Sequence, residues 1–329
     1  MTVSVDPSLA EGKAKSGGAS SAFLRLMQKN GLMLFFAVLL LIFAAVRPEF
    51  LSLPNLRNIA ISAAVLGILA VGQTIVIITG GFDLSVARNA VAVSMVLALL
   101  VGLGPVVALL GAVATGMLIG LTNGVLISQT KVNPFVVTLG MYTILGSVVL
   151  LLNNGNAISQ LPDWILNMAK AEFLGISSVV WWFVIVAIAG HLLLAHTKFG
   201  RHLYAVGGNP SAARVSGVRV KRVTALAYLV CGLAAAIGGI ILTARLQIAS
   251  PVALPGAELD AIAAVIIGGT RLSGGFGSIP RTILGVLILT SLSSGLVLMG
   301  VSSYWQGAFK GAIIILAVIF DVAFASRRR

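Results

Sequence analysis

The chain has 329 residues, of which 58% are hydrophobic and 9% charged, and its mean hydropathy is +1.07. Soluble domains carry about a quarter charged residues, so this composition excludes an ordinary soluble protein and indicates one that lies mostly in a membrane. The net charge of +13 does not indicate nucleic-acid binding, because the basic residues are scattered between apolar runs.

Long apolar runs separated by short polar segments follow one another along the chain. Residues 1–30 are polar and basic, and we expect a disordered cytoplasmic tail there, since the apolar run begins too late for a cleaved signal peptide. A transmembrane helix needs about 20 mainly apolar residues. The runs predict about ten such helices, at residues 31–46, 58–79, 85–102, 105–127, 135–152, 179–195, 223–243, 261–269, 282–299 and 307–325.

The expected fold is therefore an all-α polytopic membrane protein, with a transmembrane domain at residues 31–326 and a basic cytoplasmic tail at 327–329. The segment at 261–269 is too short to cross a membrane alone, so it either begins earlier or forms half of a broken helix. With both termini inside, most lysines and arginines between the helices lie on the cytoplasmic side, as the positive-inside rule requires.

The pattern GGxxLS occurs twice, each time after an apolar segment. Residues 77–85 (IITGGFDLS) and 265–273 (VIIGGTRLS) agree at five of nine positions, which predicts two related halves whose helices break at the glycine pairs. Broken helices in transporters lie near the transport path; chance similarity in a glycine-rich chain is the alternative. The path candidates are Gln73, Gly80, Gly81, Asp83, Ser85, Asn123, Asn133, Thr138, Gly268, Gly269 and Arg271.

Asp83 is the acidic residue of the first motif, and a carboxylate at the centre of a membrane span costs about 2.5–3.5 kcal/mol. Three roles are open for it. It caps the helix that begins after the motif, it forms an ion pair with Arg88 or Arg271, or it couples transport to protons.

A strongly basic segment at residues 196–222 holds six basic side chains and no acidic one. Within it Asn209 suits an N-cap, Pro210 the first helical position and Gly217 a left-handed residue after the last turn, so residues 211–216 predict a short helix. A helix this short is not stable alone in water, and we expect it to pack against another surface. A solvated basic loop that obeys the positive-inside rule is the alternative.

No catalytic, metal or nucleotide site is recognisable in the sequence. Cys231 has no second cysteine to pair with, and the histidines lack the spacing of metal ligands. No GxxxxGKS/T motif is present to bind nucleotide phosphates. The energy for transport must therefore come from a partner or from an ion gradient.

Residues 211–217 (SAARVSG) resemble the EAAxxxG signature of ABC importer permeases, with Ser211 at the usual glutamate position. Five ordered blocks, covering nearly the whole chain beyond the tail, resemble the ribose-type monosaccharide permeases, whose superfamily also holds the branched-chain amino acid permeases. They are GGFDLS at 80–85, KVNPFVVTLG at 131–140, FGRHLYAVGGNPSAARVSGV at 199–218, ELDAIAAVIIGGTRLSGG at 258–275 and GVSSYWQGAFKG at 300–311.

The resemblance implies a transport subunit and not an enzyme, in the inner membrane of a bacterium, within an importer of two permeases and two ATPases. The second permease would be another copy of this chain or a paralogue. A separate ATP-binding cassette ATPase would bind ATP and Mg, so this chain itself would carry no cofactor. A periplasmic or lipid-tethered sugar-binding protein would deliver the substrate, a pentose, a hexose or a related polyol.

The same resemblance assigns roles to two sets of residues. The family's coupling helix, which docks in a groove of the ATPase, would fall on Asn209, Pro210, Ser211, Ala212, Ala213, Arg214 and Gly217. Three arginines on the outer side would meet acidic patches of the binding protein, unless they are ordinary flanking charges: Arg47, Arg57 and Arg245.

The sequence departs from the family beside both motifs, with Ala87-Arg88-Asn89 where Gly-Ser is usual and Ile279-Pro280-Arg281 where small apolar residues and glycine are usual. These departures leave the sugar open. Two alternatives also stand: an ABC permease for branched-chain amino acids or nucleosides, and a proton-coupled secondary transporter that uses Asp83.

Overall fold

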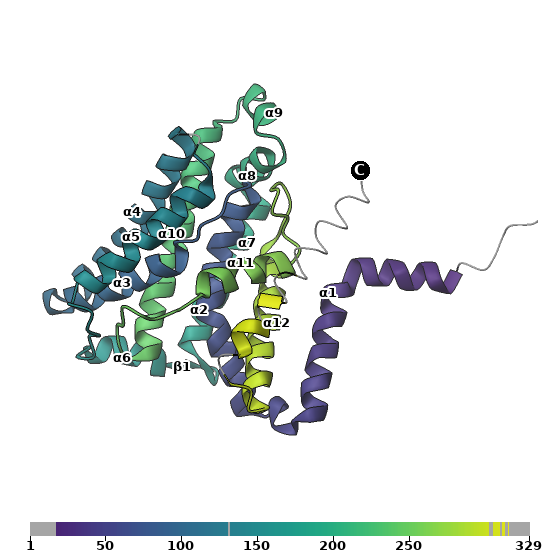
Figure 1. Cartoon of the computed structure of the whole chain (residues 1–329), viewed down its shortest axis with the longest axis horizontal. Helices are drawn as coiled ribbons and strands as arrows, with labels where there is room; N and C mark the ends of the chain where they lie inside the picture. Colours follow the sequence, from purple (N-terminus) through teal and green to yellow (C-terminus); the bar gives the residue numbers. More distant parts are fainter. Residues whose placement is uncertain (1–17, 131, 303–304, 310, 313–314, 316–329) are drawn as a thin grey trace, which may run out of the picture.

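The structure is a computed structural model that describes residues 18–130, 132–302, 305–309, 311–312 and 315. Figure 1 shows a helical bundle in which the short helix α9 lies at one end and strand β1 at the other. The elements are α1 Gly18–Val46, η2 Pro48–Leu51, α2 Leu53–Ile78, α3 Val86–Leu100, η3 Val101–Leu103, α4 Pro105–Thr130, α5 Pro134–Leu151, α6 Asp163–Lys170, β1 Glu172–Phe173, β2 Ile176–Ser177, α7 Ser178–His196, α8 Lys198–Gly208, α9 Pro210–Val215, α10 Val220–Leu246, α11 Ala257–Ile267 and α12 Ile279–Leu298.

Seven helices in the described part of the chain are long and apolar enough to cross a membrane: α2, α3 with η3, α4, α5, α7, α10 and α12. The fold is thus an all-α polytopic membrane protein, as predicted. The apolar part of α1, Gly31–Val46, is shorter than these spans. Helix α11 has 11 residues, in line with the short segment predicted at 261–269. Of the predicted helix at 307–325, the structure describes residues 307–309, 311–312 and 315, which are helical, and the rest lies outside the described residues.

Two polar segments contain more helix than the sequence predicted. Helix α1 begins at Gly18, inside the predicted disordered tail at 1–30. The basic segment at 196–222, predicted as a loop around one short helix, contains α8 as well. Its first turn is capped by Thr197, whose Oγ1 accepts from the amide of Gly200 at 2.9 Å. Its apolar residues Leu203 and Val206 are buried against the bundle, and this burial stabilises a helix that the charges alone do not predict.

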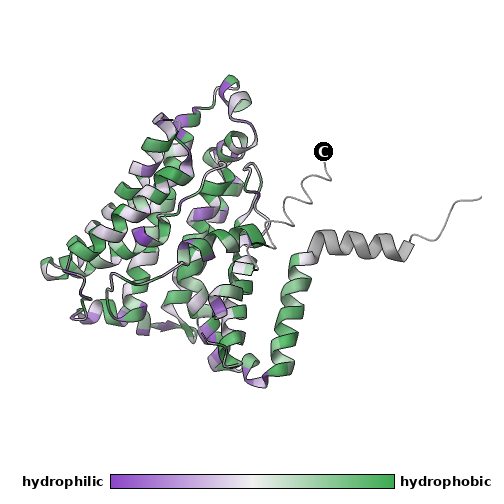
Figure 2. Ribbon diagram, viewed as in Figure 1, coloured by the Kyte–Doolittle hydropathy of each residue, from purple (hydrophilic) through white to green (hydrophobic). Residues whose placement is uncertain are grey.

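Helices α4 and α10 pack closely, backbone against backbone. Three glycines of α4 face α10 at a spacing of four residues, Gly116, Gly120 and Gly124, and a Cβ atom at Gly120 would lie 2.4 Å from the carbonyl oxygen of Tyr228. Small residues of this kind let transmembrane helices approach each other closely. Helices α2 and α10 are mostly buried, whereas α4 and α5 expose most of their residues. Figure 2 shows hydrophobic residues along the helices and hydrophilic ones mainly at helix ends and in connections.

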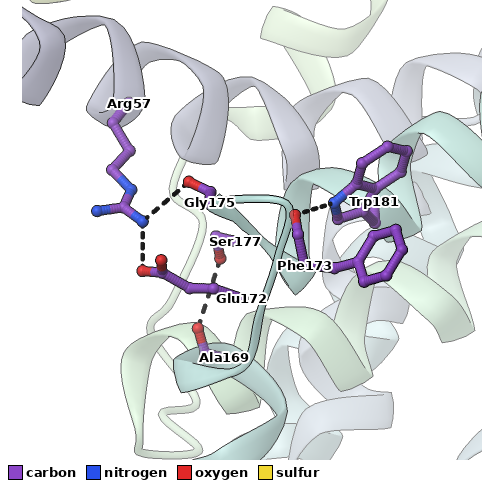
Figure 3. Close-up of polar contacts among 7 residues, drawn as sticks. All are labelled: Arg57, Ala169, Glu172, Phe173, Gly175, Ser177 and Trp181. Carbon is purple, nitrogen blue, oxygen red and sulfur yellow. Dashed lines mark hydrogen bonds and ion pairs between the residues drawn. The ribbon is translucent and has the colours of Figure 1, made fainter.

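A small hairpin marks the end of the bundle opposite α9. Its strands pair Glu172 with Ser177 and are joined by a turn in which Leu174 (φ +54°) and Gly175 (φ +73°) are both left-handed, the geometry of a tight hairpin turn. Figure 3 shows how it is held: Arg57 of α2 forms an ion pair with Glu172 and donates to the carbonyl of Gly175, while Trp181 of α7 donates to the carbonyl of Phe173 at 3.1 Å. We call the two ends of the bundle the α9 end and the hairpin end.

Candidate functional site

Helix α9 has the local structure that the sequence predicted. Asn209 Oδ1 accepts hydrogen bonds from the amides of Ser211 and Ala212, at 3.0 Å each, and Pro210 is the first helical residue. Gly217 lies in the left-handed region at φ +83°. Ala213 is buried against the protein, whereas Val215 is 90% exposed. Helix α9 therefore packs against the protein through one small residue and leaves the rest of its surface exposed.

Helix α8 connects α9 to the end of α2 through backbone contacts between glycines. A Cβ atom at Gly207 would lie 1.8 Å from the carbonyl oxygen of Ile78 and 2.5 Å from the amide nitrogen of Gly275. A Cβ atom at Gly274 would lie 2.8 Å from the amide nitrogen of Gly80. The amide of Gly275 also donates to the carbonyl of Ile78 at 2.9 Å. We call Gly80, Gly207, Gly274 and Gly275, with the Ile78 carbonyl, the glycine junction.

A second contact supports the glycine junction. The hydroxyl of Tyr204 in α8 donates to the carbonyl of Gly277 at 2.8 Å. Burial raises the pKa of this phenol, so it keeps the proton that it donates. The segment 268–278, which contains the second GGxxLS motif, is thus joined to α8 at two places.

The two glycine pairs end their helices in the same way but in opposite order. In α2 the left-handed residue is the first glycine, Gly80 (φ +83°), and the amide of Gly81 donates to the carbonyl five residues earlier at 3.3 Å. In α11 it is the second glycine, Gly269 (φ +81°), and the following amide donates to the carbonyl five residues earlier at 3.1 Å. Gly80 therefore corresponds to Gly269, and the predicted alignment with Gly268 is wrong by one residue.

The remaining glycine of each pair permits a close approach instead of a turn. A Cβ atom at Gly81 would lie 2.5 Å from the hydroxyl of Tyr228, and one at Gly268 would lie 2.6 Å from the carbonyl of Arg281. Each pair thus combines a left-handed residue with a site of close contact, and the order of the two is exchanged between the halves. This exchange explains why aligning the two motifs by residue identity gave the wrong register.

Asp83 lies in a buried polar cluster with Ser85 and Asn123. Its Oδ1 atom accepts from the amide of Ser85 at 2.9 Å and from the hydroxyl of Ser85 at 2.6 Å. The amide of Asn123 in α4 donates to the same hydroxyl at 2.8 Å. Ser85 is the N-cap residue of α3, so this bond joins Asp83 to the residue before the helix and not to a free amide of its first turn. The capping role proposed for Asp83 therefore stays a prediction.

Neither arginine proposed as an ion-pair partner of Asp83 contacts it in the described part of the chain. The guanidinium of Arg88 lies 5.1 Å from the ring centre of Tyr142 in α5 and donates to its hydroxyl at 3.4 Å. Arg271 lies 5.0 Å from the ring of Phe276, which Arg281 also approaches at 5.6 Å. The ion-pair role of Asp83 therefore has no support in the structure.

The other residues predicted for the path and for docking lie in different places. Asn133 is exposed and caps α5, since its Oδ1 accepts from the amide of Phe135 at 2.9 Å. Gln73 is fully buried in α2. Of the outer arginines, Arg47 is exposed, Arg57 is bound to the hairpin, and Arg245 lies half-buried in a cavity. The docking role of the three arginines stays a prediction.

This cavity lies between α2, α10, α11 and α12 at the hairpin end and has a volume of about 650 Å³. Its wall combines aliphatic side chains with polar ones, and Arg245 donates to the hydroxyl of Ser62 at 3.1 Å. Sequence reasoning selected only Arg245 among its lining residues. A signal was present, because Asn58 and Ser62 lie four residues apart on an otherwise apolar helix and so share one face. The polar lining is Asn55, Asn58, Ser62, Arg245, Asp260, Thr290, Ser293 and Ser294.

Residues 55–318 match the family described as branched-chain amino acid transport system permease component. The ribose import permease of Escherichia coli K12 is 41% identical over 293 residues, which cover 86% of this chain and 90% of that protein. The ribose import permease of Bacillus subtilis 168 is 42% identical, with 90% and 93% covered. The L-arabinose ABC transporter permease of Azospirillum brasilense is 32% identical, with 99% and 95% covered.

No solved structure matches the chain. The family match covers most of the sequence, and the relatives align over most of their own length. The chain therefore belongs to the family of branched-chain amino acid transport system permease components, as a member of its ribose-type monosaccharide importer permeases.

Proposed function

We propose that this chain is the permease subunit of an ATP-driven importer for a monosaccharide, a pentose, a hexose or a related polyol. The observation that carries the proposal is α9, a capped two-turn helix that exposes most of its surface and is joined by backbone contacts to the end of α2. A helix of this length is not stable alone in water and is stabilised by packing against another surface. The names of the relatives, import permeases for ribose and arabinose, support the substrate class.

The α9 end is the cytoplasmic end in this proposal. Six basic residues of α8, α9 and the start of α10 are all exposed there, and basic loops favour the cytoplasmic side. They are Lys198, Arg201, Arg214, Arg219, Lys221 and Arg222. The cavity at the hairpin end then faces the outside of the inner membrane, and both termini lie in the cytoplasm.

Transport proceeds by alternating access. A partner ATPase binds ATP and Mg, and its closure moves α9, which docks in a groove of that subunit. Helix α8 passes the movement to the glycine junction, where the end of α2 and segment 268–278 meet. A second permease, identical or paralogous, completes the pathway, and a sugar-binding protein delivers the substrate at the hairpin end.

Reconstitution in proteoliposomes tests the proposal. The permease is combined with the ATPase and the binding protein, and uptake of ribose, arabinose and allose is measured with and without ATP. Sugar uptake that requires all three components is expected. Uptake driven by a pH gradient without the ATPase, and lost in Asp83→Asn, would instead establish a proton-coupled transporter. ATP-driven uptake of leucine or a nucleoside, with no sugar transported, would establish the other ABC class.

A further inference from the structure

We propose that the cavity at the hairpin end is a monosaccharide-binding site on the permease itself, with Ser62 and Arg245 on its wall and Gln73 at its inner end. This inference rests on the proposed function, because it names where the imported sugar binds within the membrane domain. It departs from the sequence-based prediction, in which Arg245 docks the binding protein.

The size and the lining of the cavity suit a small neutral polyol. Its volume of about 650 Å³ falls within the range of about 300–1,000 Å³ common to small-molecule sites. The described lining holds one basic residue, Arg245, and one acidic residue, Asp260, so their formal charges cancel. Six further polar residues are neutral amides and hydroxyls, which both donate and accept hydrogen bonds, as sugar hydroxyls do. Aliphatic side chains such as Leu66 and Leu242 can pack against the C–H faces of a sugar ring.

Gln73 lies one turn beyond Leu69, the last lining residue of α2, in the direction of the α9 end. Ser62, Leu66 and Leu69 line the cavity from one face of α2. Gln73 follows Leu69 by four residues and so lies on the same face, about 6 Å further along the helix. Its side chain is 0% exposed, and neither its amide nitrogen nor its amide oxygen has a hydrogen-bond partner in the described part of the protein. A buried unpaired amide is destabilising by about 1–3 kcal/mol, so Gln73 is suited to bond a ligand that enters from the cavity.

A contact between α2 and α12 lies at the same depth along α2 as Gln73. The hydroxyls of Thr74 in α2 and Thr282 in α12 share a hydrogen bond of 2.8 Å and are both fully buried. Thr282 precedes the lining residue Leu289 by seven residues and so lies on the cavity face of α12. The glycine junction lies beyond this contact, at the end of α2. A sugar held at Gln73 is therefore separated from the α9 end by a short contact between α2 and α12.

Protection of introduced cysteines provides the first test. The native Cys231 is fully buried, so a hydrophilic maleimide reports only the introduced thiol. We place cysteine at Ser62 or Ser293 in the cavity, and at the exposed Ser159 near the hairpin end as the control. Saturating ribose, arabinose or allose should slow labelling of Ser62→Cys and Ser293→Cys but not of Ser159→Cys. Protection by leucine alone, or no protection by any of these sugars, would overturn the proposal.

A second test uses Gln73→Leu in the complete importer, because leucine has a similar volume but no amide. The amount of sugar moved per ATP hydrolysed should fall about tenfold, the effect of losing about 1.4 kcal/mol. An unchanged ratio would overturn the role of Gln73. The two proposals fail separately: ATP-driven uptake without cysteine protection rejects this site alone, whereas protection without ATP-driven uptake rejects the importer alone.

Discussion

Replacing Gly207 with alanine should weaken the coupling between α9 and the membrane helices. The new Cβ atom would lie 1.8 Å from the carbonyl oxygen of Ile78, whereas ordinary contact begins at 3.4 Å. Helix α8 must therefore move by about 1.6 Å away from α2. The obstructing atoms at Ile78 and Gly275 are both backbone, so no side-chain rotation can relieve the overlap. Overpacking of this kind costs about 1–3 kcal/mol.

The neighbouring Gly208 provides a matched control. A Cβ atom there meets no heavy atom within 4 Å, and the residue lies in the same helix. Gly208→Ala should therefore be neutral or stabilise α8 by up to about 1 kcal/mol through helix propensity. The assays are the thermal unfolding of the purified permease and the amount of sugar moved per ATP hydrolysed in proteoliposomes. Gly207→Ala should lower both, and Gly208→Ala should lower neither.

Equal behaviour of the two variants in both assays would refute this reasoning. A lower unfolding temperature for Gly207→Ala with unchanged coupling would show that the glycine junction stabilises the fold but does not transmit movement. Unchanged stability with reduced coupling would be the clearest support, because the helix would then have shifted at little cost to the rest of the bundle.

Four further predictions rest on single residues or contacts. Asn209→Ala removes the acceptor for two amides of α9 and should destabilise that helix by about 1 kcal/mol. Gly217→Asp places a side chain on a left-handed residue, and it should uncouple ATP hydrolysis from uptake while membrane insertion stays intact. Asp83→Asn keeps an oxygen for the amide of Ser85, so ATP-driven uptake should persist; its complete loss in a correctly folded variant would contradict a purely structural role for Asp83. The Arg57–Glu172 ion pair is about half exposed, and a double-mutant cycle on unfolding should give a coupling energy below about 1 kcal/mol.

The sequence was most informative where the determining contacts are local. Asn209 binds amides two and three residues away, and Gly217 ends the helix through its own backbone angle, so both could be recognised without tertiary structure. The same holds for the ends of α2 and α11 at the glycine pairs. The register between those pairs was predicted wrongly because glycines at matching positions have different roles. The first glycine is left-handed in one pair and makes a close contact in the other.

The cavity could not be predicted in the same way, because α2 forms it together with three helices much later in the sequence, α10, α11 and α12. Ser62 and Arg245 are separated by 183 residues, yet their side chains share a hydrogen bond. From the sequence alone, each is a polar residue near a helix end, and such residues commonly flank membrane helices whether or not they line a cavity. Only packing places them on one wall, and only packing shows that Arg57 faces the hairpin instead.

The glycines explain how a helix as short as α9 can act on a membrane domain. A contact between long side chains would absorb a movement of about 1 Å by changing rotamers. At the glycine junction backbone meets backbone, so a displacement of α8 must move the end of α2 or segment 268–278. Gly208 ends α8 and Asn209 caps α9, so no flexible linker separates the two helices. Because glycines have no side chains, the contact between α8 and α2 is rigid. One methyl group at Gly207 is therefore expected to disrupt it.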